Sequence, residues 1–447
     1  MRRAVGPLLA VTVALVLADS AVVTLALPDI LRHLDTTVAQ VAWVLIAFNL
    51  VLGLSAVPTA VVFARTQPRI VGAVGIAVFA GASAWCAVAQ SIDVLIGARC
   101  VQALGGALAL VGCLELLVAE YGERRGVAAW VTAGVVGTAI GPFAGGVLTE
   151  AFSWQAIFVV QVPFAVLAVP AALVVAAAPE SVPDRHRPAI RPNLTLALLS
   201  AALTAALFLL VLLLVEGWQH SPGAAAITVS VVPVAALAAR PLARLFRPPA
   251  EVEVAVGCFL IAGGLVGLTL LPSADLVWTI APQALVGLGL GLTVDHLTAQ
   301  AMAMRLPRIR HASWTISARH LGVVVGLAIL TPVFTADLMD AQVPAQEAIT
   351  SLVLDAPLLP EDKVALAQSL GGELTQQEGR VPDLSHAFAT ADLAPEERPA
   401  AAHLERDLDD QLERAATQAF RNSFLIGAGL ALLALLTVIA PRRRTTS

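Results

Sequence analysis

Twelve apolar runs, most of them about 20 residues long, recur along this chain of 447 residues. About 20 apolar residues suffice for a helix to cross the hydrocarbon core of a bilayer. Only helices and closed barrels satisfy their backbone polar groups there. Apolar residues make up 58% of the chain and charged residues 13%, which excludes an ordinary soluble domain. The sequence therefore predicts an all-α, polytopic membrane protein of about 12 transmembrane helices, at 6–27, 41–63, 70–89, 94–117, 126–148, 155–178, 194–215, 223–239, 252–271, 276–304, 313–335 and 419–440.

Basic residues gather on one side of the predicted bundle. With a cytoplasmic amino terminus, eighteen of the 27 Arg and Lys residues fall in cytoplasmic segments, and only Arg32 is basic in a short outer loop. This distribution is the one that the positive-inside rule requires. We therefore expect a multi-pass protein of the plasma membrane with both termini in the cytoplasm.

Two polar segments interrupt the series of spans. Residues 179–192 are polar and rich in proline, which predicts a cytoplasmic linker between two pseudo-symmetric six-helix bundles, 1–178 and 193–447. Residues 338–418 separate the last two spans on the outer side and carry 16 acidic and 5 basic side chains. Short helices are possible in this segment, but its weak apolar content favours a solvated loop over a cap above the outer vestibule.

Two charged residues are predicted near the middle of the membrane, where an unpaired charge costs on the order of 3 kcal/mol. Asp19 of the first span and Arg99 of the fourth differ in depth by only about 5 Å, so they can meet if their helices adjoin. A carboxylate whose pairing with arginine changes can take up and release a proton. Asp19 and Arg99 are therefore candidates for proton coupling, with a fixed structural pair as the alternative. Gln102, on the same helix as Arg99, is a candidate cavity residue.

A second pair, Asp295 of the tenth span and Arg319 of the eleventh, is predicted closer to the cytoplasm. These two side chains are expected to bond to each other, in a cavity or gating role or a purely structural one. The sequence contains no cluster with the spacing of metal ligands.

The fifth span has glycine at every fourth position. Gly137, Gly141 and Gly145 leave one helix face without side chains, with Gly146 beside it, and another helix can approach such a face closely. Pro142 removes a backbone hydrogen bond and favours a bend. The pattern suits helices that move against each other, and static close packing is the alternative.

These motifs resemble those of the major facilitator superfamily, in particular its fourteen-helix drug:proton antiporter branch. The matching segments are DSAVVTLALP from Asp19, RCVQALGGA from Arg99, GTAIGPFAGG from Gly137 and SWQAIFVVQVP from Ser153. One departure lies in the loop after the second span, AVVFARTQPR, where Ala64 holds the position of an aspartate that latches the closed state in that family. The twelve predicted spans are a second departure.

The resemblance implies secondary active export, in which a proton moves inward past Asp19 and Arg99 while an amphipathic small molecule moves outward by alternating access. It implies a monomer in the lipid bilayer that needs no cofactor beyond a proton gradient. The sequence has no phosphate-binding motif for ATP, no motif of an intramembrane enzyme and no sign of nucleic-acid binding. The alternative is a non-transporting scaffold or receptor that keeps the fold and binds a partner through segment 338–418.

Overall fold

The structure, a computed structural model, describes residues 2–62, 64–178, 186–246, 248–302, 305–376, 388 and 397–439. Within these residues every regular element is helical, and twelve stretches are long and apolar enough to cross a membrane. The predicted all-α fold with twelve spans is therefore confirmed. Parts of three predicted segments lie outside the described residues: 179–185 of the linker, 377–387 and 389–396 of the acidic segment, and 440–447 at the carboxyl terminus.

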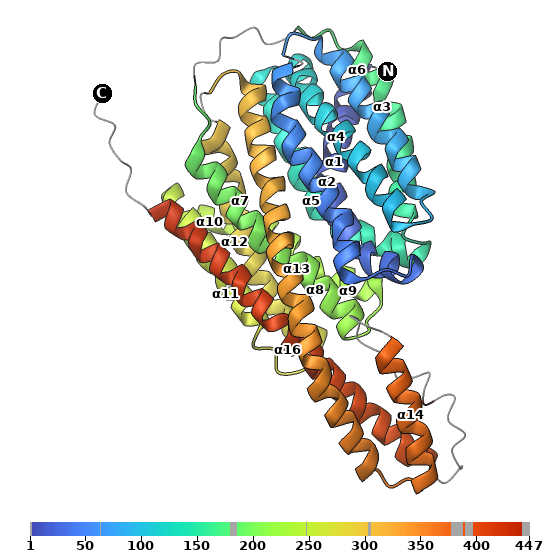
Figure 1. Ribbon diagram of the computed structural model, residues 1–447. Coiled ribbons are helices and arrows are strands. Elements are labelled where there is room, and N and C mark those ends of the chain that lie inside the picture. The colour runs from blue at the N-terminus through green and yellow to red at the C-terminus, as the bar shows by residue number, and fades with distance from the viewer. Residues whose placement is uncertain are drawn as a thin grey trace.

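The first six spans pack against one another. Helix α3 lies along α4, α5 lies along α1, and α6 lies against α3 (Figure 1). The bounds of these helices are α1 (Arg2–His33), α2 (Val38–Val62), α3 (Pro68–Ala87), α4 (Ile92–Tyr121), α5 (Glu123–Ala151) and α6 (Ala156–Val174).

The last six spans form a second group, and two of them are irregular. The seventh consists of α7 (Ile190–Thr204), then α8 (Leu210–Leu212) flanked by two π-helical segments, Ala205–Leu209 and Leu213–Gly217. The eighth is interrupted at Ser230, close to Pro233, whose nitrogen cannot donate a backbone hydrogen bond. Its two parts and the remaining spans are α9 (Pro222–Val229), α10 (Val231–Phe246), α11 (Ala250–Leu268), α12 (Leu276–Met302), α13 (Arg308–Asp355) and α16 (Arg398–Ile439).

Glycines allow the same close approach in both groups. A Cβ atom on Gly137 of α5 would lie 2.2 Å from the carbonyl oxygen of Ala14 in α1. A Cβ on Gly322 of α13 would lie 2.2 Å from the carbonyl oxygen of Ala197 in α7. The fifth span thus packs on the first as the eleventh packs on the seventh, which is a structural sign of the pseudo-symmetry between the two groups.

The described part of segment 338–418 is helical, so the expectation of a solvated loop is wrong. Helix α13 continues to Asp355, α14 (Pro360–Gln376) packs on it, and α16 begins at Arg398, well before its membrane span. At about 1.5 Å per residue, the 48 residues of α13 reach about 72 Å, more than twice the thickness of the hydrocarbon core. These three helical parts share a small apolar core that includes Ile349, Val353, Leu366, Leu370, Leu404 and Leu408.

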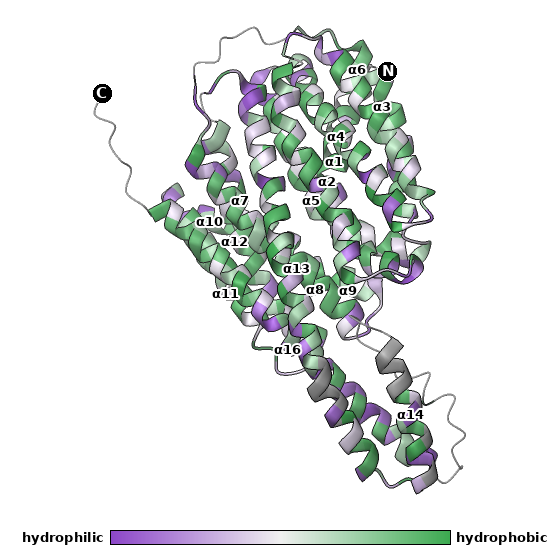
Figure 2. Ribbon diagram, viewed as in Figure 1, coloured by the Kyte–Doolittle hydropathy of each residue, from purple (hydrophilic) through white to green (hydrophobic). Residues whose placement is uncertain are grey.

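We call the helical part of this segment, residues 342–376 and 397–418, the arm. Figure 1 shows the arm projecting away from the bundle rather than folding over it, so it is not a cap either. The bundle is coloured mainly as hydrophobic in Figure 2, whereas the arm carries many hydrophilic residues. The arm marks one side of the molecule, the arm side. The opposite side, where α1 begins and α16 ends, is the termini side.

The two groups of spans meet differently along their length. On the arm side α5 packs on α9, and a Cβ on Gly146 would lie 2.1 Å from the Cβ of Ala226. Arg32 Nη2 of α1 also lies 3.1 Å from Glu216 Oε1 at the end of the seventh span. Toward the termini side, α5 and α10 diverge around a cavity.

Candidate functional site: a buried carboxylate beside a central cavity

Asp19 is completely buried within the first group of spans, where it accepts three hydrogen bonds. Arg99 Nη1 bonds directly to Asp19 Oδ2. Gln161 Nε2 donates to Asp19 Oδ1 at 2.9 Å, and Gln102 Nε2 donates to the same oxygen at 3.2 Å. Because every donor faces a carboxylate oxygen, this arrangement accommodates the ionised form of Asp19.

Arg99 is equally buried and is held on its other sides by the second span. Its Nε donates to the carbonyl oxygen of Val44 at 3.4 Å, and its guanidinium carbon lies 4.1 Å from the centre of the Phe48 ring. Its Nη2 has no hydrogen-bond partner. The pair is therefore buried away from the cavity, and the removal of either charge would leave the other buried without a counter-charge.

The structure brings together Asp19 and Arg99 as their similar depths suggested. It also places Gln102 in this cluster, where it donates to Ser83 Oγ at 2.9 Å, and not on the walls of the cavities described below. Ser83 was not singled out by the sequence, because a lone polar residue in a span carries no sign of which neighbour it contacts.

A central cavity of three adjoining chambers lies between the two groups of spans. Their volumes are about 320, 130 and 30 Å³. Helices α5, α7, α10 and α12 contribute most of the largest chamber, and its wall is mainly leucine, valine and alanine. Arg319 of α13 lines all three chambers.

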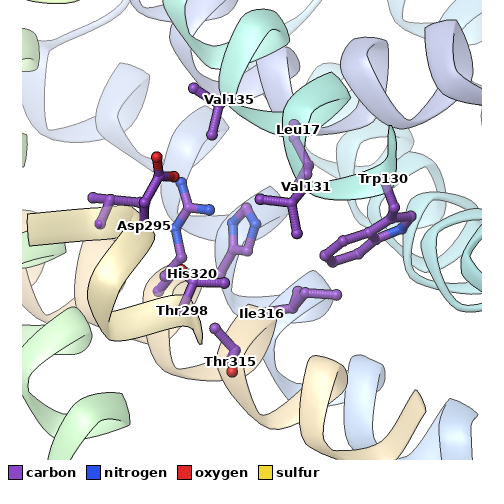
Figure 3. A pocket seen from close by; sticks show the side chains of 12 residues that line it. Leu17, Trp130, Val131, Val135, Asp295, Thr298, Thr315, Ile316 and His320 are labelled. Atoms are coloured by element: carbon purple, nitrogen blue, oxygen red, sulfur yellow. The ribbon is translucent and has the colours of Figure 1, made fainter. Parts of the chain in front are cut away.

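The smallest chamber shows how the two groups of spans face each other. In Figure 3, Ile316 and His320 of α13 and Asp295 of α12 lie across from Leu17 of α1 and Val131 of α5. The smallest chamber thus lies between the two groups of spans. It adjoins the larger chambers at Arg319, which lines all three.

Ser20 connects the Asp19 cluster to this cavity. Ser20 follows Asp19 in α1 and lines the middle chamber, and its Oγ donates to Asn49 Oδ1 at 3.3 Å. Asn49 Oδ1 also lies 2.7 Å from His320 Nδ1, which forms a polar link between the two groups of spans. Successive helix residues point about 100° apart, so Asp19 lies behind the cavity wall, one position from a residue that faces it.

The pairing expected for Asp295 and Arg319 is wrong. Asp295 Oδ2 lies 2.9 Å from Nη2 of Arg240, and Asp295 forms no other ion pair with the described residues. Arg319 lies near enough to be influenced by the charge of Asp295, but it makes no ion pair with it in the described structure. The sequence ended the eighth span at Ala239 and so placed Arg240 in a loop, whereas α10 continues to Phe246 and brings Arg240 to the cavity.

Helix α5 takes part in both the packing and the cavity. Gly137, Gly141 and Gly145 face α1, Gly146 faces α9, and Pro142 lines the largest chamber. The helix is continuous through Pro142. One element therefore connects the tight α1 contact, the arm-side closure and the cavity wall.

No group of three or more metal-ligating side chains converges anywhere in the described residues.

Comparison with known proteins identifies the family. The family model of the Major Facilitator Superfamily matches residues 9–331, which is more than two thirds of the chain. The chain belongs to the major facilitator superfamily. Proteins of this superfamily are transporters and not enzymes, and the chain is accordingly a multi-pass protein of the plasma membrane.

Several bacterial members of the superfamily are similar in sequence. The methylenomycin A resistance protein of Streptomyces coelicolor is 28% identical over 380 residues, 76% of this chain and 78% of that protein. The tetracenomycin C resistance and export protein of Streptomyces glaucescens is 34% identical over 169 residues, 37% of this chain and 31% of that protein. The multidrug efflux pump LfrA of Mycolicibacterium smegmatis is 33% identical over 159 residues, 35% of this chain and 32% of that protein. The chain thus matches about a third of the length of the latter two relatives.

A solved structure shares the fold over nearly the whole chain. It is a bacterial homolog of the human lysosomal transporter Spinster in an inward-facing, unoccupied conformation. The TM-score is 0.65 at 14% sequence identity, with 98% of this chain and 97% of that chain covered. At this identity the likeness concerns the fold alone.

Proposed function

We propose that this member of the superfamily exports amphipathic small molecules in exchange for protons. The observation that carries the proposal is a fully buried ionisable carboxylate, Asp19, one residue from Ser20 on the wall of a largely apolar cavity between two groups of spans. An intramembrane carboxylate is costly and is retained where protons or substrates move. The resistance and export functions named for the relatives point to the same outward direction.

The coupling follows from the Asp19 cluster. In the described state Asp19 accepts hydrogen bonds from Arg99 and from two amides. Rotation of α1 with the first group of spans would loosen these bonds and bring Asp19 toward the cavity, where it can take up a proton. Return of the deprotonated side chain to Arg99 would then accompany the opposite movement, so that proton and cargo cross in opposite directions.

The closed side of the cavity fits this cycle. The arm side is closed by α5 against α9 and by Arg32 beside Glu216. With both termini in the cytoplasm, as the distribution of basic residues favours, the described state would receive cargo from the cytoplasm or the inner leaflet. Opening of the arm side would release it outward.

Proteoliposomes test the proposal directly. Three probes with one skeleton and different charges should be offered: 1-naphthalenesulfonate, 1-naphthalenesulfonamide and 1-naphthylmethylammonium. With an acid interior, proton efflux should drive uptake of at least one probe beyond the uptake by protein-free vesicles, which trap the free amine passively, and a protonophore should abolish this excess. The variant Asp19→Asn should lose the response to the gradient, whereas Asp93→Asn, at an exposed position in the first turn of α4, should keep it. If no probe moves in vesicles that contain folded protein, the proposal fails for this class of cargo.

A further inference from the structure

Arg319 is unusual because it is a cation on the wall of an apolar cavity without an ion-pair partner among the described residues. Its expected partner Asp295 is bonded to Arg240 at 2.9 Å. Arg319 lines all three chambers, so its charge is present wherever a ligand in the central cavity would lie. A guanidinium in such surroundings lacks the compensation that a buried charge normally has.

The charges that face the cavity do not cancel. The ionisable residues lining the three chambers are Arg240, Asp295, Arg319 and His320. Asp295 neutralises one of the two arginines. His320 Nδ1 donates a hydrogen bond to Asn49 Oδ1, and a neutral imidazole ring is sufficient for this bond. The remaining charge is one positive unit, and it is carried by Arg319.

Arg319 lies where the two larger chambers of the cavity adjoin. The two larger chambers share five lining residues, of which Thr138, Ser200 and Arg319 are polar and Leu203 and Leu207 are apolar. The polar residues come from α5, α7 and α13, so they converge from both groups of spans. A ligand whose anionic group lies at this junction would place its apolar body in the chamber of about 320 Å³.

We propose that the central cavity binds amphipathic organic monoanions, carboxylates or sulfonates, whose charged group bonds to Arg319. This inference rests on the proposed function, because it names the class of cargo for the same cavity. The planar guanidinium donates two parallel hydrogen bonds to such a group. Because the surrounding wall is apolar, the attraction is stronger than in water, and a cation of the same shape is repelled. Monoanionic charge matches the single positive unit that the cavity leaves uncompensated.

Binding to the purified protein in lipid nanodiscs tests the inference without any requirement for transport. By calorimetry, 1-naphthalenesulfonate should bind at least about tenfold more tightly than its neutral counterpart 1-naphthalenesulfonamide, and 1-naphthylmethylammonium should bind more weakly still. Decanesulfonate carries the same anionic group on an alkyl, lipid-like body, so its affinity shows whether the cavity prefers such a body to a compact aromatic one. Equal affinity for the anion and the neutral compound would overturn the inference.

Four substitutions at three positions give a pattern of opposite signs that mere destabilisation cannot produce. Arg319→Gln should weaken binding of 1-naphthalenesulfonate by about tenfold or more, and Arg319→Lys should restore part of it. Arg240→Gln should also weaken binding, because it frees Asp295 to compete for Arg319. Asp295→Asn should strengthen binding, because it adds one net positive charge. Unchanged or weaker binding in Asp295→Asn, with thermal unfolding like that of the parent, would contradict the inference.

The outcomes for the two proposals are separable. Anion-selective binding that depends on Arg319, in a protein that moves no probe across a membrane, would leave the binding site intact and overturn export. Proton-driven uptake of the neutral or cationic probe, unaffected by Arg319→Gln, would leave export intact and overturn the anion site.

Discussion

The charges within the spans are neutralised to different degrees, and this difference separates their roles. Asp19 and Arg99 are buried together and form an ion pair. Arg319 faces the cavity, and the neighbouring carboxylate of Asp295 is paired with Arg240 instead. A fully enclosed pair suits a switch that is broken only when the helices move. An accessible cation suits a binding group that is always ready for a ligand.

Removal of Arg99 alone should be more damaging than removal of both members of its pair. Arg99→Gln leaves Asp19 buried without its cation, which should destabilise the protein by about 3 kcal/mol or more. The double variant Asp19→Asn/Arg99→Gln removes both charges and should recover a large part of that loss. Thermal unfolding in detergent, followed by intrinsic fluorescence, compares the three proteins. If the double variant unfolds at the same temperature as Arg99→Gln, the two side chains are not energetically coupled.

Some of these residues were predictable and others were not, for physical reasons. The contact of Asp19 with Arg99 was predictable from their similar depth, on the condition that their helices adjoin, since two opposite charges at one level of a membrane favour meeting. The pairing of Asp295 with Arg240 does not follow, because it requires knowing that α10 continues past Ala239. The bond between His320 and Asn49 joins the two groups of spans, and such distant contacts leave no local pattern.

At the scale of elements, helix α5 is the one most sensitive to added volume. A Cβ on Gly137 would lie 2.2 Å from the carbonyl oxygen of Ala14, and one on Gly145 would lie 2.3 Å from that of Val22. Neither contact can be relieved by a side-chain rotation, because both neighbours are backbone atoms. The packing of α5 on α1 therefore requires glycine at these positions.

Gly137→Ala should separate α5 from α1 and cost about 1–3 kcal/mol in stability, as overpacking does. Transport should fall because the same helix lines the cavity. Gly97→Ala is the matched control, since a Cβ there meets nothing within 4 Å. It should be neutral or slightly stabilising, because alanine is the better helix former. Equal unfolding temperatures and equal probe uptake in the two variants would refute the close packing of α5 on α1.

The arm should be dispensable for transport. Its apolar core is separate from the cores of the bundle, and no residue of the arm lines the three chambers. Replacement of residues 342–411 by a short flexible linker should therefore leave probe uptake within about twofold of the parent. Correct insertion is checked by protease accessibility of the termini. Loss of uptake in an inserted protein would instead support a role of the arm in the cycle.

The arm also shows where sequence patterns are weak. Leu404, Leu408 and Leu412 recur every fourth residue and mark the buried face of α16, but the surrounding acidic residues lower the mean hydropathy to that of a solvated segment. Transmembrane spans are easier to recognise, since a helix that crosses lipid needs about 20 consecutive apolar residues. The twelve spans were therefore predictable, whereas the arm depends on a small core to which three separate helices contribute.

For the whole molecule, the arrangement of two groups of spans around one cavity is the one that the proposed alternating access requires. The arm side is closed by the contact of α5 with α9, while α5 and α10 diverge toward the termini side. Movement of one group against the other would open the arm side and close the termini side. The close contacts of α5 on α1 and of α13 on α7 lie within groups and repeat from one group to the other, which suits movement of each group as a unit.

Proton movement driven by cargo alone tests the exchange most directly. Vesicles containing the protein and an internal pH indicator start with equal pH on both sides, and 1-naphthalenesulfonate is added outside. We expect the interior to become alkaline as the probe enters and protons leave. In Asp19→Asn we expect no pH change, while exchange of labelled for unlabelled probe continues. An equal alkaline shift in Asp19→Asn would contradict the assignment of proton exchange to this carboxylate.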